Sequence, residues 1–511
     1  MTNNADTHFA EYSREATALI PLVGAIIIGI VFHFIPRDAQ RVSVGYVLDT
    51  LAHKGAVFRW SNTFVQLFGG AAAIATGQSV GREGPAVHLG AATSAGIGRW
   101  LMLSSPQLRL LAGCGVAAAI GASFNTPIAG VIFAMEVILM EYTAAGLLPI
   151  IVAATSATAI SRFFYGDDPA FLVPALDSMS LMDAPWLLLG AVLAGIVSAA
   201  FIKIYKAAAA QRHRPVILRF TFIGVVTAIV VYFYPSVTGV GYDIVQQNLD
   251  GFLPIALLIA LLFGKLLLTP IATGLGMPGG LIAATLFIGA CLGGIVDEIS
   301  LLHSGEAATT SSYVIIFMGT VMSAVLNAPL SALTAVLELT YAPDVLMPTM
   351  GAIIVANIVC REVLKQPGIF ERPAIERTPW RQWAQATPCS RLMTRRVISV
   401  RQKKAHQEIL DVSQHPKWVV ITVSGEPIHV LPTEQYIELQ ARSDAFEAFE
   451  QLPSQNIASA VITDSAWGML KRMESQNTEI AVIRRLHGKQ RGEVLGVVTK
   501  HVIEERFKDS P

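Results

Sequence analysis

The sequence predicts an all-α polytopic membrane domain at residues 18–371, followed by a small α/β domain at residues 388–508. Composition is the first reason. The chain has 511 residues, of which 53% are hydrophobic and 14% are charged, whereas a soluble protein has about 25% charged residues. The second reason is a change along the chain. Up to about Leu364 the sequence is apolar, and from about Lys365 it becomes charged and shows alternating apolar patterns. Three prolines with Arg and Glu between them mark the boundary and predict a linker.

The ends and the cysteines add further limits. Residues 1–17 are polar and mixed in charge, and they lack the basic region of a cleaved signal peptide, so the first apolar segment is predicted to be a retained span. The four cysteines are scattered and have no metal-ligand spacing, so they are interpreted as small apolar residues. Net charge is zero, which gives no indication of a nucleic-acid partner.

The membrane domain is predicted to contain several helices shorter than a full span. A hydrocarbon core of about 30 Å needs about 20 residues, and many of the apolar segments are shorter or are interrupted at Gly or Pro. Short, interrupted segments in corresponding halves are typical of a transport site built from half-helix ends. The predicted segments lie near residues 18–36, 63–80, 85–103, 109–121, 127–163, 184–205, 216–234, 253–273, 279–297, 312–325, 328–341 and 346–364.

The sequence Gly81-Arg82-Glu83-Gly84-Pro85 places two charges inside this apolar region. A charge at bilayer depth costs roughly 2.5–3.5 kcal/mol, so such groups usually face a cavity and have a function. The glycines let backbone N–H groups turn toward a ligand, and the proline favours a helix start. A helix N-terminus attracts anions, so the motif predicts a carboxylate that competes with an anion for one pocket. The alternative is an Arg82–Glu83 pair in a surface loop.

An internal repeat supports a duplicated transporter. The stretch from Phe124 to Glu136 matches the stretch from Leu326 to Glu338: both contain Asn-x-Pro and reach a Glu nine residues after the Pro. Each match follows a glycine-rich half-helix signal. The two glutamates are interpreted mainly as structural residues, hydrogen-bonded to nearby amides.

A second candidate site follows the sequence Met277-Pro-Gly-Gly280. The two glycines precede an apolar helix, so the amides of Leu281 and Ile282 are candidates to face an anion; close helix packing is the alternative. Lys265 is a lone cation in an apolar run. It either sets a positive potential near the anion path or snorkels to the surface.

Basic residues predict the orientation. They cluster between Lys203 and Arg219 and again after Arg361, and the positive-inside rule assigns both clusters, and with them the C-terminal domain, to the cytoplasm. We find no nucleophile–base pair, metal cluster or phosphate loop in the sequence, so no enzymatic activity is expected.

The glycine-flanked Arg-Glu motif, the Asn-x-Pro…Glu repeat and the Pro-Gly-Gly segment together resemble the CLC family of chloride channels and proton-coupled chloride transporters. The resemblance covers about Ile20 to Glu371. It implies an all-helical homodimer with one anion pore per subunit, built from two inverted repeats. It also implies a pair of helices before Ala18, and this chain begins too late to contain them. A misassigned start, an artificial truncation and a native loss are the alternatives.

The resemblance also implies roles for residues. Glu83 corresponds to the gating glutamate and to the outer point of a proton path. The anion-binding groups implied by the resemblance are Gly81, Arg82, Glu83, Gly84, Leu281, Ile282, Phe370 and Ser43.

This chain departs from the family pattern at four places. The family's Gly-Ser-Gly-Ile-Pro motif is absent, and either Val42 or Ser43 takes the serine position. The Phe and Pro of Gly-x-Phe-x-Pro are replaced in the stretch 280–284. The pore tyrosine is replaced by Phe370, which has no hydroxyl. Exchangers of the family carry a second Glu where this chain has Val137, and a valine cannot carry a proton.

Two similar segments after the linker resemble a pair of CBS domains. Each pattern combines strands with an amphipathic helix, exemplified by a helix at 466–474 and a strand at 479–484. Such pairs often bind an adenine nucleotide, with an Asp near the end holding the ribose. Here His501 takes that place, so nucleotide binding and a purely structural dimerisation module are both retained as interpretations.

The expected function is voltage- or pH-gated permeation of chloride and other small anions through a pore in each subunit of a homodimer. A proton-coupled chloride antiporter is the alternative. A non-conducting, nucleotide-sensing membrane module is an alternative of another class. No cofactor is required beyond the nucleotide considered above. The expected partners are chloride, membrane lipid and a second copy of the chain, but no nucleic acid. The expected location is the inner membrane of a bacterium, with the C-terminus in the cytoplasm.

Overall fold

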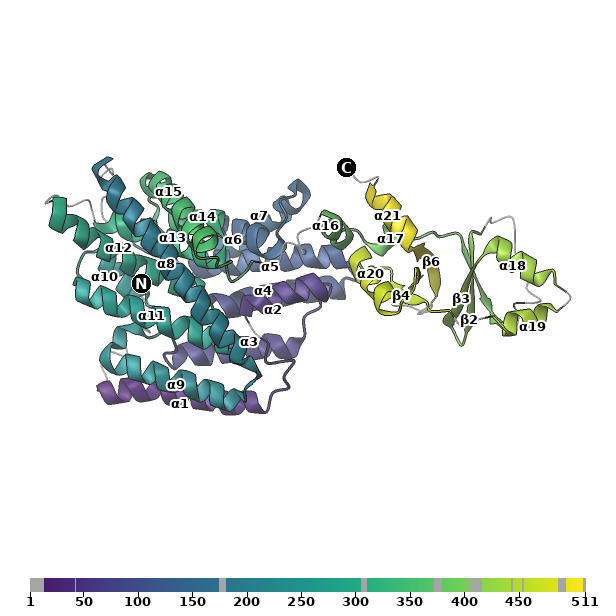
Figure 1. The fold of residues 1–511 in the computed structure, drawn as a ribbon, viewed down its shortest axis with the longest axis horizontal. Helices are drawn as coiled ribbons and strands as arrows, with labels where there is room; N and C mark the ends of the chain where they lie inside the picture. Colours follow the sequence, from purple (N-terminus) through teal and green to yellow (C-terminus); the bar gives the residue numbers. More distant parts are fainter. Residues whose placement is uncertain are drawn as a thin grey trace. The chain divides into compact units, whose positions relative to one another are not determined.

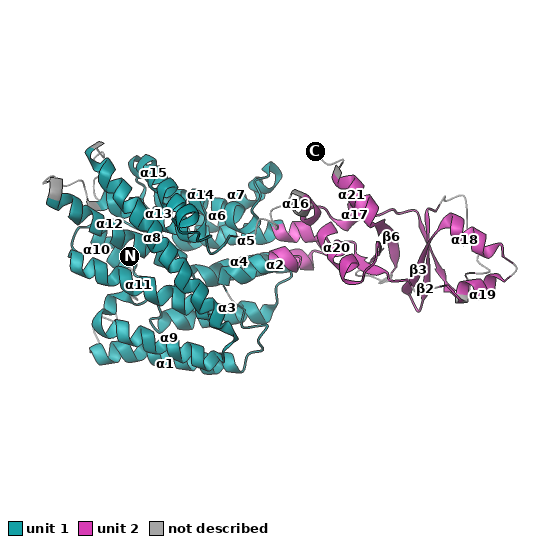
Figure 2. Cartoon of the chain, in the orientation of Figure 1, with its two compact units in different colours: residues 1–50, 57–96, 110–371 teal, residues 51–56, 97–109, 372–511 magenta. Residues whose placement is uncertain are grey.

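The structure is a computed structural model that describes residues 13–41, 43–173, 181–304, 310–371, 379–402, 405, 416–442, 444–452, 455–485 and 493–508. The chain forms two compact units (Figure 2). The first contains residues 1–50, 57–96 and 110–371, and the second contains residues 51–56, 97–109 and 372–511.

The first unit is all-helical, as predicted (Figure 1). Eight helices of the described residues are long and apolar enough to cross a membrane, judged by length and composition. The helices of the first half are α1 (Arg14–His33), α2 (Ser43–His53), α3 (Trp60–Ala75), α4 (Glu83–Trp100), α5 (Ser105–Phe124), α6 (Pro127–Phe133), the π-helix η2 (Ala134–Leu139), α7 (Ala144–Tyr165) and α8 (Ala184–Ala210). Those of the second half are α9 (Val216–Phe233), α10 (Tyr242–Leu249), α11 (Ile255–Leu275), α12 (Ile282–Ser304), α13 (Thr310–Leu326), α14 (Pro329–Thr340), α15 (Leu346–Asn357) and the π-helix η7 (Ile358–Val363).

The structure divides one predicted segment and adds two helices that the sequence did not predict. The single segment expected at 127–163 is wrong, because Met140 takes a left-handed conformation with φ of 56° and ends η2. Thr143 then starts α7 as its N-cap, and its side chain accepts a hydrogen bond from the Gly146 amide. Helices α2 and α10 were not predicted. They have 11 and 8 residues, too few for a span, so the search for long apolar runs missed both.

The internal repeat is visible in the backbone of the Asn-x-Pro segments. Asn125 and Asn327 have φ of 60° and 61°, and each lies just before a helix that starts at a proline. Each asparagine Oδ1 accepts a hydrogen bond from an arginine of a later helix, from Arg162 Nε at 2.6 Å and from Arg361 Nη1 at 2.5 Å. Two stretches 202 positions apart therefore share backbone conformation and hydrogen-bond partners, which confirms the duplication.

The repeats are joined by reciprocal helix caps. Glu338, in α14, accepts hydrogen bonds from the Ile128 and Ala129 amides at the start of α6, at 2.9 and 2.7 Å. Glu136, in η2, accepts them from the Leu330 and Ser331 amides at the start of α14, at 3.1 and 2.8 Å. Each carboxylate satisfies N–H groups that have no partner within their own helix. The structural interpretation of both glutamates is supported, but the amides belong to the opposite repeat and not to neighbouring positions.

The second unit contains two three-stranded sheets with the same topology. In the first, β1 (Val397–Arg401) runs parallel to β2 (Trp418–Val423), which pairs antiparallel with β3 (Glu426–Pro432). In the second, β4 (Ala458–Val461) runs parallel to β5 (Ile480–Arg484), which pairs antiparallel with β6 (Val494–Thr499). Both middle strands carry a register shift near their ends. The predicted duplication of small α/β segments is therefore confirmed.

The helices of the second unit are short. They are α16 (Pro379–Ala386), α17 (Cys389–Leu392), α18 (Thr433–Gln440), α19 (Ala445–Glu450), α20 (Ala466–Ser475) and α21 (Lys500–Lys508). Helix α20 matches the amphipathic helix expected at 466–474, and its apolar face is buried through Met469, Leu470 and Met473. Strand β5 matches the strand expected at 479–484.

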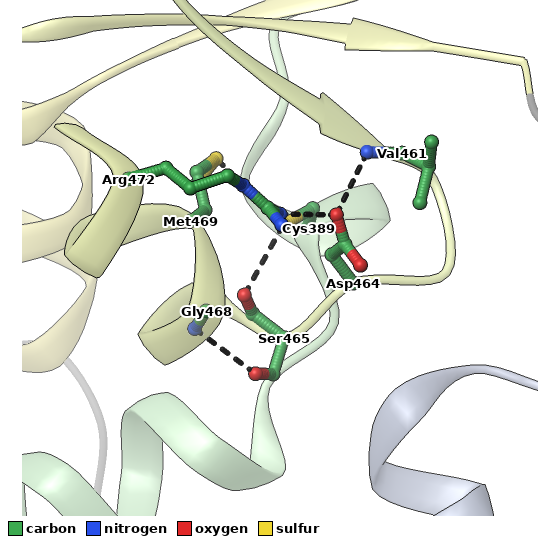
Figure 3. A network of polar contacts seen from close by, with 7 residues as sticks. All are labelled: Cys389, Val461, Asp464, Ser465, Gly468, Met469 and Arg472. Atoms are coloured by element: carbon green, nitrogen blue, oxygen red, sulfur yellow. Dashed lines mark hydrogen bonds and ion pairs between the residues drawn. The ribbon is translucent and has the colours of Figure 1, made fainter. Parts of the chain in front are cut away.

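A polar network fixes the start of α20 (Figure 3). Asp464 accepts a hydrogen bond from the Val461 amide at 2.9 Å and forms an ion pair with Arg472. Ser465 caps α20 by accepting from the Gly468 amide at 3.2 Å. The Cys389 thiol donates to the Ser465 carbonyl at 3.5 Å, and burial raises the pKa of that thiol to about 12. The network ties α17 to the β4–α20 loop and keeps Cys389 as a neutral, buried side chain.

Candidate functional site

The site is built where two helices of the membrane unit begin. Helix α4 starts at Glu83 and α12 starts at Ile282. The chain just before each helix forms an isolated antiparallel bridge between Gly81 and Gly280. The Gly81 amide donates to the Gly280 carbonyl at 3.0 Å, and the Gly280 amide donates to the Gly81 carbonyl at 2.7 Å. The two glycine-rich signals of the sequence therefore lie directly beside one another, one from each half.

The Glu83 carboxylate crosses from the first half to the second. Glu83 is 1% exposed, and its Oε1 accepts a hydrogen bond from the Ala283 amide at 2.6 Å. That amide lies in the first turn of α12, where unpaired N–H groups and the helix dipole favour negative charge. The other oxygen, Oε2, is buried and accepts no hydrogen bond from the described residues. An acidic side chain thus lies at a helix N-terminus with one of its two carboxylate oxygens unused.

Two glycines make room for this carboxylate. A Cβ atom added to Gly81 would lie 1.9 Å from Glu83 Oε2, and one added to Gly280 would lie 1.8 Å from the same oxygen. Both distances are far below van der Waals contact, so neither position admits a larger residue while Glu83 keeps this conformation. Gly84, the second residue of α4, is also buried.

Arg82 anchors the start of α4 and does not pair with Glu83. Its Nη2 donates to the Ser123 carbonyl at 2.8 Å, near the end of α5. Its guanidinium also lies over the rings of Phe124 and Tyr242, at 5.1 and 5.5 Å from their centroids. Since Glu83 is buried and Arg82 is bound elsewhere, the alternative of an Arg–Glu pair in a surface loop is wrong.

Lys265 lies inside the membrane unit and does not snorkel to the surface. The residue is 1% exposed, and its Nζ donates to the Gly239 carbonyl at 2.5 Å. The ammonium group lies 5.0 Å from the centroid of the Phe287 ring. Phe287 belongs to α12, the helix whose first turn holds the Glu83 carboxylate. The interpretation of Lys265 as a source of positive potential near the site is the one that its burial supports.

Leu281 and Ile282 lie at the start of α12 and are both buried, as expected of groups that line the site. The amide that contacts Glu83 is that of Ala283, which sequence reasoning missed. A backbone donor has no side-chain signal, but the first four N–H groups of any helix lack intrahelical partners. Extending the predicted set by one residue along α12 would have included it.

Phe370 and Ser43 have described contacts with groups other than the Glu83 carboxylate. Phe370 is buried and packs edge-to-face on Phe133, with ring centroids 6.5 Å apart. Phe133 and Ile282 in turn line a small cavity of about 20 Å³. Ser43, at the start of α2, has φ of 78°, and its amide donates to Gln66 Oε1 at 3.0 Å. No described hydrogen bond connects Ser43 or Phe370 with Glu83; the alternative serine position, Val42, lies outside the described residues.

Comparisons with known proteins give one consistent result. Residues 23–361 match the family described as voltage gated chloride channel. A relative from Ralstonia nicotianae, named as ClcB-like, is 30% identical, and the match covers 70% of this chain and 85% of the relative. The H(+)/Cl(-) exchange transporter ClcA of Vibrio cholerae is 27% identical, with coverage of 59% and 67%.

Two solved structures share the fold. A slow cyanobacterial Cl-/H+ antiporter has a TM-score of 0.62 at 21% identity, covering 70% of this chain and 85% of that one. A eukaryotic CLC transporter has a TM-score of 0.61 at 16% identity, covering 97% and 92%.

Proposed function

The chain belongs to the voltage-gated chloride channel family, the CLC family, and on that premise we propose that it carries chloride across a membrane along a path gated by Glu83. It is an integral, multi-pass membrane protein whose C-terminal sheets are consistent with a CBS pair. The observation that carries the proposal is the hydrogen bond from the Ala283 amide to Glu83 Oε1. A carboxylate held by a helix N-terminus is a built-in competitor for an anion that would bind the same N–H group.

Gating follows from this competition. While the Glu83 carboxylate is ionised and bound at the start of α12, it occupies the anion's place. Protonation weakens its hold on the amide, because a neutral carboxyl is a poorer acceptor than a carboxylate, and an incoming anion can then replace it. Backbone amides supply partial positive charge without the tight binding of a full cation, so chloride can also leave. We propose that this path is lined by residues 81–84, Leu281, Ile282, Phe370 and Ser43.

Two transport modes use the same gate. Uncoupled, channel-like permeation is favoured by Val137, which is buried in η2 and cannot carry a proton. Proton-coupled exchange is favoured by Glu83 itself, a titratable group at the anion site. The relatives named as exchange transporters and antiporters add to that second candidate.

Reconstituted protein separates these modes. We expect chloride efflux from proteoliposomes, recorded together with external pH while valinomycin and potassium clamp the voltage. Chloride efflux without proton movement identifies a channel, whereas protons driven uphill by the chloride gradient identify an exchanger. Glu83→Gln should leave efflux insensitive to pH and remove any proton movement. Glu362→Gln, which changes an exposed glutamate of the same unit, should behave as wild type. No flux of chloride, nitrate or fluoride would overturn the proposal and favour the non-conducting alternative.

The remaining expectations stay proposals. We propose that the protein is a homodimer in the inner membrane of a bacterium, with the C-terminal unit in the cytoplasm. An adenine nucleotide at the CBS pair stays a prediction: His501, at the position where an Asp would hold the ribose, is exposed and lies 3.9 Å from Glu505.

A further inference from the structure

A large basic cavity opens in the membrane unit, apart from the Glu83 carboxylate. It has a volume of about 1100 Å³ and lies among the C-terminal ends of α1, α8 and α11 and the N-terminal ends of α2 and α9. Its described lining contains one acidic residue, Asp49, and five arginines: Arg37, Arg41, Arg212, Arg214 and Arg219. A cavity with this excess of positive charge, at the upper end of the size of ligand sites, favours an anionic occupant.

Two of the arginines, Arg212 and Arg219, form hydrogen bonds with the C-terminal end of α11, which explains their position. Arg212 donates to the Thr273 and Gly274 carbonyls at 2.9 and 2.6 Å, and Arg219 donates to the Leu275 carbonyl. Cations at these carbonyls complement the C-terminal end of α11. Arg219 nevertheless retains one buried donor, Nε, that has no hydrogen-bond partner among the described residues. Arg219, a lining residue, therefore has one N–H group left unused, buried within the cavity wall.

The other arginines have no comparable structural explanation. Arg41 approaches Asp49 only loosely, at 3.9 Å, and its side chain is largely exposed. Arg37 and Arg214 are exposed, and no described acidic side chain forms an ion pair with either. Guanidinium groups gathered around a single acidic side chain repel one another, whereas their planar donors match the oxygens of a phosphate group. The chemistry of the cavity thus fits a ligand with several anionic oxygens better than a single halide.

Apolar side chains beside the cavity indicate where such a ligand comes from. Phe34 lines the cavity and is 80% exposed, and Ile217 and Leu218, next to Arg219, are exposed as well. The basic connection between α8 and α9 is the part that the positive-inside rule assigns to the cytoplasmic side. Basic pockets between transmembrane helices on that side bind anionic phospholipid headgroups. Acyl chains would then lie along the exposed apolar residues while the phosphate enters the cavity.

We propose that this cavity binds a phosphate group, carried by an anionic phospholipid headgroup or by a soluble phosphate. The consequence for transport rests on the proposed function. Ser43 and Gly276 line the same cavity, and Gly276 precedes by four positions the glycine that is bridged to Gly81. A phosphate held there places negative charge beside the inner approach to the Glu83 site. Its binding therefore lowers chloride flux.

Native mass spectrometry of the purified full-length protein tests binding without reference to flux. The probes are cardiolipin, phosphatidylcholine and, for the soluble source, inorganic pyrophosphate. The double variant Arg37→Gln, Arg214→Gln removes the two unpaired arginines of the lining. Its matched control, Lys203→Gln with Lys365→Gln, removes the same charge from exposed residues that do not line the cavity. We expect the first variant to lose at least tenfold in cardiolipin binding and the control to retain it.

Each outcome decides the proposal. Arginine-dependent binding of cardiolipin but not pyrophosphate assigns the site to a lipid headgroup, and the reverse assigns it to a soluble phosphate. No binding of either, or equal binding by both variants, overturns it. A chloride-efflux assay with and without cardiolipin keeps the two proposals separate: retained binding with no flux contradicts only the transport function, and flux without arginine-dependent binding contradicts only the phosphate site.

Discussion

Glu83 shows at the scale of one residue how a buried charge is held in the membrane unit. One carboxylate oxygen takes the Ala283 amide, while the other is buried without a hydrogen bond from the described residues. A buried carboxylate that is only partly satisfied lowers stability. Such a group is expected where a second occupant replaces it, which is the role proposed for chloride.

The glycines beside Glu83 give a direct prediction. Gly280→Ala places a Cβ where Glu83 Oε2 lies, at 1.8 Å, so the carboxylate has to leave its position at α12. The added Cβ also crowds the position that chloride would take and lies 2.8 Å from the Gly84 nitrogen. We therefore expect chloride efflux to lose its pH dependence, as in Glu83→Gln, without a rise in rate, and the double variant to show the same pH-independent efflux. Gly351→Ala is the matched control, because an added Cβ there meets no atom within 4 Å. Efflux that keeps its wild-type pH dependence in Gly280→Ala, with the protein folded, would contradict the assignment of Glu83 as the gate.

His429 predicts how the stability of the second unit depends on pH. It lies in β3, and burial lowers the pKa of its imidazole below the ordinary value. Below pH of about 6.5 the His429 imidazole therefore binds a proton more readily in the unfolded chain than in the folded one. The free energy of unfolding consequently falls as pH decreases below about 6.5.

Hydrogen exchange of the intact protein measures this effect. We expect strands β2 and β3 to lose protection between pH 7.5 and pH 5.5, after correction for the intrinsic exchange rate, and His429→Leu to lose less. His501→Leu is the control, since that side chain is 82% exposed. An equal loss of protection in both variants would argue against His429 as the cause.

At the scale of residues, the sequence indicated which charged side chains matter but did not indicate which backbone N–H groups bind them. Arg82 and Glu83 stand out because charges are rare in apolar segments. The Ala283 amide has no such signal, and neither the hydrogen bond from Arg82 to the Ser123 carbonyl nor the ring beneath Lys265 could be inferred without the fold. Ser43 and Phe370 were named through family resemblance, and no described contact places them against the carboxylate.

At the scale of elements, the two short helices α6 and α14 form the best-defined link between the repeats. Each begins at a proline after an Asn in left-handed conformation. Glu338 of α14 caps the first amides of α6, and Glu136 of η2, the helix that directly follows α6, caps the first amides of α14. The exchange of caps gives the first amides of two helices their hydrogen-bond acceptors across the pseudo-symmetric pair.

Removing one of these caps tests this link. Glu338→Ala leaves the Ile128 and Ala129 amides without their acceptor, and an unsatisfied buried donor costs about 1–3 kcal/mol. We expect a lower thermal unfolding midpoint in detergent for Glu338→Ala and for Glu136→Ala, and no change for the exposed control Glu362→Ala. Unfolding midpoints equal to that of wild type would show that the two caps add nothing to stability.

The elements that sequence alone missed have two causes, short length and a local backbone conformation. Long apolar runs located the spans, but α2 and α10 are too short to be recognised by length. The break at residues 140–143 follows from the left-handed Met140, a conformation that the sequence Leu-Met-Glu does not indicate. The Asn-x-Pro repeat succeeded because proline, asparagine and a fixed spacing are local signals.

The whole molecule combines a duplicated helical membrane unit with a duplicated pair of small sheets (Figure 1). The order of these parts could be predicted from the change in composition near Leu364. The meeting of residues 81 and 280 could not, because it depends on how the two halves pack. That meeting creates the proposed anion site, since neither half alone supplies both the carboxylate and the amide that holds it.

The most direct test of this account is a structure of Glu83→Ala determined with bromide and located by its anomalous scattering. The account predicts a bromide ion at the position of the missing carboxylate, within hydrogen-bond distance of the Ala283 amide, and none there in the wild-type protein at neutral pH. Absence of bromide from that position in Glu83→Ala, with the bridge between Gly81 and Gly280 intact, would contradict the claim that Glu83 and the transported anion compete for one site.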